Sequence, residues 1–339
     1  MRNLRTIFLV VAALFALTAQ CQVAEPLKLI QTIPMPGLHD GDFDHFAASV
    51  PDHLLFLAAE ENGAVEVFDL NTNKLIHTIS DLKAPHSLVY RADSKKLFVV
   101  DGDTAEVKIY EGDSYKPSGS IKLMDDADSS VYDPATKYMY VVNGGSGAHV
   151  AYTLISVIDT TTAKKIADIK IDSESVEAMV LEKSGPRMFA NLYAKNAVAV
   201  IDREKRTVTA TWSIEQEGKK NAAIAFDEAD HRLFVVARDP GKVIFMDSDS
   251  GKVLNSVPCI GNTDDAVFDA GSRRLYVVGV PSLDIFQLLG RNRFRQIGQL
   301  PSSFHGVTGI LLPELNRYYV AVNHHGDTPA QVQIYDVVP

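Results

Sequence analysis

The chain has 339 residues, with 43 Asp and Glu against 33 Lys and Arg, so its formal net charge at pH 7 is −10. No stripe of Lys and Arg interleaved with aromatic residues appears, which disfavours nucleic-acid binding and a membrane-surface role. Length alone suggests about two domains, and 46% hydrophobic residues are enough for a large core.

The first 24 residues have the pattern of a secretory signal peptide. Arg2 and Arg5 precede eleven uncharged apolar residues, 7–17, and small residues follow. The run is too short to span a bilayer comfortably, so we expect cleavage between residues 18 and 24, no membrane span afterwards, and a periplasmic or secreted protein. Lipidation of Cys21 is the alternative, although Gln20 stands where a small residue is wanted.

The rest of the chain, 25–339, repeats with a period of about 42 residues. An aromatic residue inside an apolar strand recurs at separations of 42, 42, 49, 45, 42 and 43 residues, at Phe56, Phe98, Tyr140, Phe189, Phe234, Tyr276 and Tyr319. An alternating strand follows each, and in most repeats it ends in Asp. This period is typical of propeller blades, which cannot bury their faces singly and therefore form one domain.

We therefore predict an all-β fold, a seven-bladed β-propeller of four-stranded antiparallel blades. Residues 27–35 alternate like a strand before the first blade, and the last blade lacks a fourth strand. The N-terminal strand is expected to complete the C-terminal blade and so hide edge strands that an open array would expose.

Tyr140-Val141-Val142-Asn143, followed by Gly144, and the LFVV and LYVV cores with VxVxD partners resemble the YVTN-type seven-bladed β-propellers. The resemblance covers Leu27 to Pro339 and implies the fold rather than an activity. Lactonase-type seven-bladed propellers are also similar, but none of their catalytic motifs can be matched to residues here.

Several catalytic motifs are missing from the sequence. It contains no C-x-x-C-H, H-E-x-x-H, G-x-S-x-G or phosphate-binding glycine loop. A c-type cytochrome, a nucleophile-elbow hydrolase and a nucleotide enzyme are therefore unsupported.

Propeller geometry indicates where a site would lie, because each innermost strand starts at one rim of the central channel. Twelve residues before the seven aromatics stand Asp44, His86, Asp128, Glu177, Ala222, Asp264 and Val307, with Asp42, His45, Asp126, Asp265 and His305 nearby. The simpler interpretation is that these acids are solvated loop residues. The alternative is an oxygen-rich site for a divalent cation such as Ca²⁺. If His86 were also a ligand, the site would suit a transition metal.

Two loops that return to the same rim are longer than the others. The separation between the repeated aromatic and the last residue of the next strand is 19 residues in the third repeat and 17 in the seventh. The same separation is 13 residues in four other repeats. Long loops on a rigid scaffold often carry binding residues. The ligand-binding candidates are His45, His149, Tyr152, His305, His324, His325 and Asp327.

These observations favour an exported, monomeric binding or scaffold protein that uses the channel-mouth face for a small molecule or an envelope protein. The alternative is a metal-assisted hydrolase, lactonase-like, whose catalytic and metal candidates are Asp44, His86, Asp128, Glu177 and Asp264. A third hypothesis, an accessory protein for a redox or cofactor-handling system, has only His149, His324 and His325 as ligands.

Overall fold

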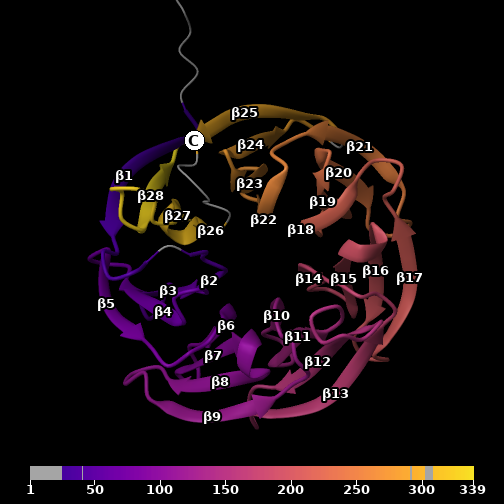
Figure 1. Ribbon diagram of the computed structural model, residues 1–339. Helices are drawn as coiled ribbons and strands as arrows, with labels where there is room; N and C mark the ends of the chain where they lie inside the picture. The colour runs from indigo at the N-terminus through magenta and orange to yellow at the C-terminus, as the bar shows by residue number, and fades with distance from the viewer. Residues whose placement is uncertain (1–24, 40, 291, 302–307) are drawn as a thin grey trace, which may run out of the picture.

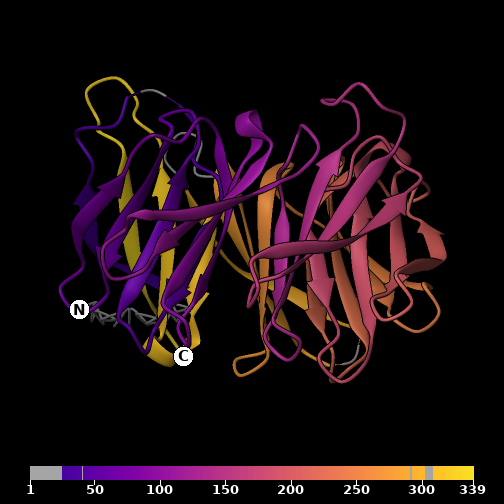
Figure 2. The same ribbon diagram turned by 90° about the horizontal axis from the view of Figure 1, so that it is seen from below.

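The computed structural model describes residues 25–39, 41–290, 292–301 and 308–339. The predicted signal peptide, His305 and Val307 lie outside these residues. Seven four-stranded antiparallel sheets stand in a ring around a central channel (Figure 1). Their strands run between the two faces of the ring, and the loops gather at those faces (Figure 2). The prediction of a seven-bladed β-propeller is confirmed.

The two inner strands of each blade are the short strand beside the channel and the apolar strand that follows it. The innermost strands are β2 (Phe46–Ser49), β6 (Pro85–Arg91), β10 (Ser130–Asp133), β14 (Met179–Leu181), β18 (Lys219–Asp227), β22 (Asn262–Asp269) and β26 (Gly309–Leu312). The second strands are β3 (Leu54–Ala59), β7 (Lys96–Asp101), β11 (Tyr138–Gly144), β15 (Arg187–Leu192), β19 (Arg232–Asp239), β23 (Arg274–Val280) and β27 (Arg317–Val322).

The two outer strands complete each blade. The third strands are β4 (Ala64–Asp69), β8 (Glu106–Glu111), β12 (Thr153–Asp159), β16 (Ala197–Asp202), β20 (Gly241–Asp247), β24 (Ser282–Leu288) and β28 (Gln331–Val337). The outermost strands are β5 (Lys74–Ile79), β9 (Pro117–Lys122), β13 (Lys164–Ile171), β17 (Thr207–Ser213), β21 (Val253–Pro258), β25 (Phe294–Pro301) and β1 (Leu27–Pro34). Helix in the described residues is limited to three 3-10 turns: η1 (Gly102–Thr104), η2 (Tyr193–Lys195) and η3 (Pro313–Leu315).

The hydrophobic core lies between neighbouring blades. The seven repeated aromatics sit on the second strands and are at most 2% exposed. Phe56 of the first blade, for example, stacks on Tyr90 of the second with ring centroids 5.1 Å apart. Burying one such side chain stabilises the fold by about 2 to 3 kcal/mol. Each blade thus covers its neighbour, which is why the closed ring folds as one domain.

The Asp that ends most third strands is structural. Its carboxylate accepts a hydrogen bond from a backbone N–H two or three residues later, as Asp69 does from Thr72 (2.7 Å) and Asp247 from Ser250 (2.9 Å). These bonds hold the turn toward the outermost strand, a use for which Asp is well suited.

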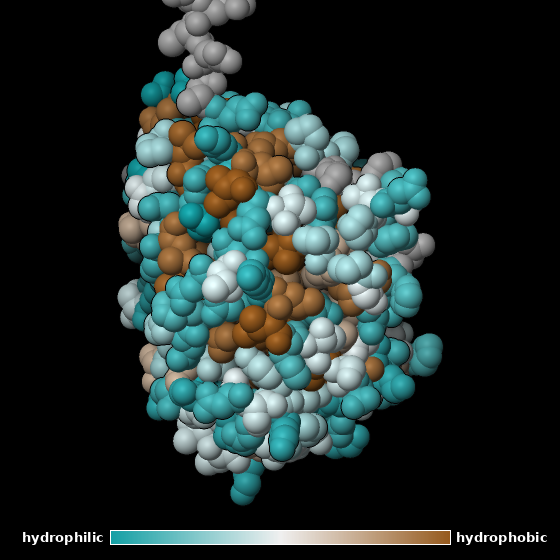
Figure 3. Space-filling view, turned by 90° about the vertical axis from the view of Figure 1, so that its left-hand side faces the viewer, coloured by the Kyte–Doolittle hydropathy of each residue, from teal (hydrophilic) through white to brown (hydrophobic). Residues whose placement is uncertain are grey.

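The N-terminal strand closes the ring, as predicted. β1 pairs antiparallel with β28, from Leu27 opposite Val337 to Pro34 opposite Gln331. Leu27 is fully buried at the boundary between the sixth and seventh blades. Apolar side chains lie among polar ones on this side of the molecule (Figure 3). The exposed large hydrophobic residues of β1 and β5 are Leu29, Ile30, Leu75 and Ile76.

Candidate functional site at the channel mouth

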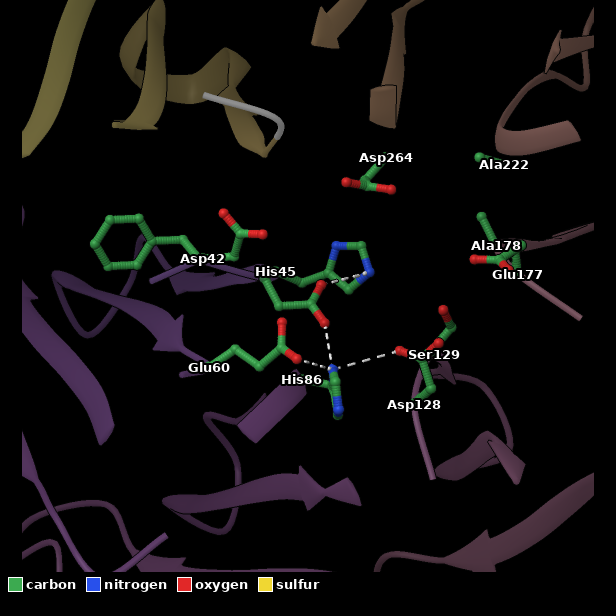
Figure 4. Close-up of a pocket in the computed structure, with 12 residues that line it drawn as sticks. Asp42, His45, Glu60, His86, Asp128, Ser129, Glu177, Ala178, Ala222 and Asp264 are labelled. Carbon is green, nitrogen blue, oxygen red and sulfur yellow. Dashed lines mark hydrogen bonds and ion pairs between the residues drawn. The ribbon is translucent and has the colours of Figure 1, made fainter. Parts of the chain in front are cut away.

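Side chains from six blades meet in one pocket at the mouth of the central channel (Figure 4). The pocket has a volume of about 220 Å³. Six of the seven positions predicted from the twelve-residue spacing line it: Asp44, His86, Asp128, Glu177, Ala222 and Asp264. The pocket also contains Asp42, Phe43, His45, Glu60, Ser129 and Ala178.

A repeated backbone hydrogen bond places these side chains. The N–H of Asp44 donates to the carbonyl of Ala58 at 3.0 Å, two residues beyond the buried aromatic of that blade. Asp128 donates in the same way to Val142, and Glu177 to Asn191, each at 3.0 Å. The equivalent residues of the second, fifth and sixth blades, His86, Ala222 and Asp264, line the same pocket, so the position twelve residues before the aromatic lies at the channel mouth in six blades.

His45 is held between two carboxylates from different blades. Its Nε2 lies 3.2 Å from Asp44 Oδ1 and its Nδ1 lies 3.2 Å from Asp265 Oδ1. Both ring nitrogens can donate only in the imidazolium form. Burial lowers the pKa of His45, but the two carboxylates outweigh burial and raise that pKa well above its usual range. His45 therefore acts as a fixed positive charge that joins the first blade to the sixth.

His86 occupies the centre of a second group of acids. Its Nδ1 donates to Asp44 Oδ2 at 2.7 Å and lies 3.7 Å from Asp128 Oδ1 and 3.9 Å from Glu60 Oε1. Burial lowers its pKa, but the carboxylates prevail and raise the pKa of His86 to about 9. The opposite edge of the ring packs on Gly102, where an added Cβ would lie 2.7 Å from Nε2. Only the Nδ1 edge of the imidazolium therefore faces the pocket.

Two other carboxyl groups of the pocket are held partly protonated. Burial, followed by the charge of Asp44, raises the pKa of Asp128 to about 7. Burial likewise raises the pKa of Asp264 to about 6, although Arg238 forms an ion pair with it. The pKa of Glu177 is also raised, with burial again the largest cause. Six carboxyl groups thus face two imidazoles in this pocket, and its acids are not fully compensated.

The pocket opens into the channel behind it. A second cavity of about 310 Å³ shares His45, Ser129, Ala178 and Asp264 with the first. Its other walls are largely apolar side chains of the innermost strands, including Leu88, Met179 and Ile224. A ligand at the mouth therefore has polar groups around it and an apolar channel beneath.

Three side chains of the pocket could hold a metal ion. Asp44, Glu60 and His86 each offer one ligand atom, and these atoms lie within 4.8 Å of one another. Two oxygens and one imidazole nitrogen suit a divalent transition metal, and oxygens alone suit Ca²⁺. His86 would have to release its proton before Nδ1 could bind a metal.

Glu60 and Arg238 were not predicted from the sequence. Both lie four residues after the buried aromatic of their blade, in the loop that returns to the channel mouth. Asn323, at the same position in the seventh blade, donates to Asp42 Oδ1 at 2.6 Å. Counting four residues forward from each repeated aromatic, as well as twelve back, would have found Glu60, Arg238 and Asn323.

The two long loops do not line the pocket. Tyr152 lies under Lys170, with Nζ 4.1 Å from the ring centroid, and His149 is likewise absent from the pocket walls. His324 and Asp327 line a separate hollow of about 400 Å³ with His39. His325 forms a backbone bridge with Thr328. Of the ligand-binding candidates in the described residues, only His45 reaches the channel mouth.

The closed ring of seven sheets and its acid-lined mouth define a seven-bladed β-propeller. One similar solved structure is a chain in the crystal structure of the mitotic checkpoint complex, with 13% identity, a TM-score of 0.75, and coverage of 100% of this chain and 99% of that chain. Another is a chain of Kuenenia stuttgartiensis hydrazine synthase, with 17% identity, a TM-score of 0.73, and coverage of 85% of this chain and 96% of that chain. At these identities the likeness concerns the fold alone.

No family model matches the chain, and no curated protein matches it. The resemblance to YVTN-type propellers is therefore supported for the fold and not as membership of that family. Among the described residues no helix is long and apolar enough to cross a membrane.

Proposed function

We propose that this propeller is a binding protein whose ligand places a positive charge in the channel-mouth pocket. The observation that carries the proposal is the gathering of six carboxyl groups from four blades around about 220 Å³. Two carboxylates about 5 Å apart repel by about 3 kcal/mol at an effective dielectric near 20. A bound cation removes this repulsion and allows Asp128 and Asp264 to ionise fully.

The polar walls favour a small, hydrated cation. The pocket has room for about seven water molecules at about 30 Å³ each, which is enough for a divalent ion with part of its hydration shell. Phe43 is the one aromatic residue on the walls, and it is 3% exposed. An organic ammonium ion would find little aromatic surface to cover its methyl groups.

Isothermal titration calorimetry tests the proposal. We expect the full chain to bind at least one of Ca²⁺, Mn²⁺ and Zn²⁺ with a stoichiometry of one, and 1,4-diaminobutane serves as the organic cation for comparison. Asp128→Asn and Glu177→Gln should each weaken binding about tenfold, the effect of about 1.4 kcal/mol. Asp113→Asn, at a side chain 76% exposed on the outer rim, is the matched control. No binding of any of these cations would refute the proposal.

A metal-assisted hydrolase is the second candidate, and one observation favours it. Beside the potential metal ligands Asp44, Glu60 and His86 lies Asp128, whose pKa of about 7 suits a general acid or base near neutral pH. A metal there would polarise a carbonyl oxygen while Asp128 moves the proton. Turnover of a panel of lactones and esters by the metal-treated chain, lost in Glu60→Gln and in Asp128→Asn, would support this candidate, and a complete lack of turnover would reject it.

We also propose that the protein is exported and monomeric. The support is the N-terminal pattern of Arg2 and Arg5, the apolar run and the small residues after it. N-terminal sequencing of the protein from a bacterial periplasm should give a start between residues 19 and 25. Recovery of the intact N-terminus from the cytoplasm would contradict export, and light scattering measures the mass in solution.

A further inference from the structure

The cavity beneath the channel-mouth pocket, the channel cavity, is surrounded by the innermost strands of the propeller. Its volume of about 310 Å³ is near the lower end of the range of about 300 to 1,000 Å³ common for small-molecule sites. It shares four wall residues with the channel-mouth pocket, so the two spaces adjoin. Because an apolar cavity of about 150 Å³ holds one benzene molecule, the channel cavity has room for an alkyl chain of about six to eight carbons.

Equivalent positions of the seven innermost strands form a belt around this cavity. Each is paired within its blade with the residue just after the buried aromatic, as Phe46 is with Leu57. At the other three positions of the belt the residue is small, and two of these, Ala266 and Gly309, belong to neighbouring blades. Four of the belt residues carry bulky apolar side chains: Phe46, Leu88, Met179 and Ile224.

Most polar side chains of the cavity wall are already bonded within the chain. The Ser87 hydroxyl donates to the carbonyl of Asp128 at 2.8 Å and lies 2.8 Å from the Ser130 hydroxyl oxygen. Asp265 accepts from the Thr308 hydroxyl at 2.6 Å. A ligand in this cavity therefore gains affinity mainly by burying its own apolar surface against the belt.

The charge of such a ligand is restricted by the mouth above it. An anionic group would be repelled by the carboxylates of the channel-mouth pocket, and a cationic group would compete with a bound metal ion for them. A neutral carbonyl oxygen can instead complete the coordination of that ion, because Ca²⁺ accepts carbonyl oxygens beside carboxylates. A neutral head group therefore suits the two adjoining spaces best.

We propose that the channel cavity binds the alkyl chain of a neutral, medium-chain carbonyl compound whose oxygen faces the cation at the channel mouth. This inference rests on the proposed cation site and adds the chemical class of the ligand that the site takes. The chain would lie against the belt, and the carbonyl group would lie where the cavity adjoins the channel-mouth pocket.

Equilibrium dialysis against the full chain, read by mass spectrometry, tests the proposal with hexanamide, butanamide and acetamide. Dialysis is run with each of Ca²⁺, Mn²⁺ and Zn²⁺ and with a chelator. With a cation that calorimetry shows to bind, hexanamide should bind with a stoichiometry of one, and the chelator should weaken this binding about tenfold or more. Two further buried methylene groups should make hexanamide bind about tenfold more tightly than butanamide, and acetamide should bind least.

Ala266→Ile should fill the channel cavity. The equivalent residue of the fifth blade is Ile224, so a side chain of this size has a precedent at this position of the fold. Hexanamide binding should fall about tenfold or more. Cation binding should persist, because Ala266 is not among the walls of the channel-mouth pocket. Ala135→Ile adds the same atoms in an exposed turn between β10 and β11 and is the matched control.

The outcomes distinguish this inference from the cation site itself. Cation binding without hexanamide binding would overturn the inference and leave the cation site standing, whereas lack of any cation binding would refute both. Equal binding of hexanamide and acetamide would place the alkyl chain outside the cavity and overturn the inference. Hexanamide binding that is unchanged by the chelator or by Ala266→Ile would overturn it as well.

Discussion

Replacing His86 by Gln should remove a pH dependence of stability that this imidazole creates. In the folded chain its pKa is raised from 6.5 to about 9, mainly because Asp44 and Asp128 outweigh the cost of burial. At about 1.4 kcal/mol per pH unit, this difference stabilises the folded state by about 3 kcal/mol. The side chain is 19% exposed, so solvent screens it only in part.

The stabilisation is complete below pH 6.5, where the imidazole is charged in both the folded and the unfolded chain. It is lost as the pH rises to about 9, where the folded chain also releases the proton. For a chain of 339 residues, about 3 kcal/mol corresponds to about 5 °C in Tm. Urea unfolding at pH 6.5 and at pH 9 should therefore show His86→Gln clearly less stable than the natural chain at the lower pH and nearly equal to it at the higher.

His231→Gln is the control, because that imidazole is 58% exposed on the opposite face of the ring from the pocket residues. Its free energy of unfolding should stay close to that of the natural chain at both pH values. A constant difference between His86→Gln and the natural chain across this range would refute the account of His86 as an imidazolium held by carboxylates.

Three further predictions concern the ring and the pocket. Leu27→Ala should lower the free energy of unfolding by about 3 kcal/mol in urea, because it leaves a cavity where β1 closes the ring. Gly251→Ala should cost about 2 kcal/mol or more in the same assay, since φ is +72° and the new Cβ would lie 2.2 Å from Trp212 Cγ. Asp128→Asn should stabilise the cation-free chain by about 1 kcal/mol above pH 7, because it removes a partly exposed carboxylate whose ionised form burial and Asp44 disfavour. If the unfolding curves of Asp128→Asn match those of the natural chain above pH 7, this last prediction is wrong.

The fold could be predicted because the seven blades repeat one pattern. Phe56 and its six equivalents mark the second strand of every blade, and all of them are buried as the period requires. The closing role of Leu27 and its strand followed from the missing fourth strand of the last blade. Each of these inferences used local spacing, which propeller geometry converts directly into position.

The site could be predicted in part for the same reason. Asp44 and Asp128 were found because each stands twelve residues before the aromatic of its blade, and that position lines the channel-mouth pocket in the six blades where it is described. The contact of His45 with Asp265 could not be predicted, because 220 residues separate them and only closure of the ring brings the first and sixth blades together.

Anomalous X-ray diffraction from crystals of the full chain grown with Mn²⁺ tests the central claim most directly. We predict an anomalous peak in the channel-mouth pocket, among the oxygens of Asp44, Glu60 and Asp128 and beside His86 Nδ1. A pocket that holds only water under these conditions, with all six carboxyl groups in place, would contradict the claim that it binds a cation.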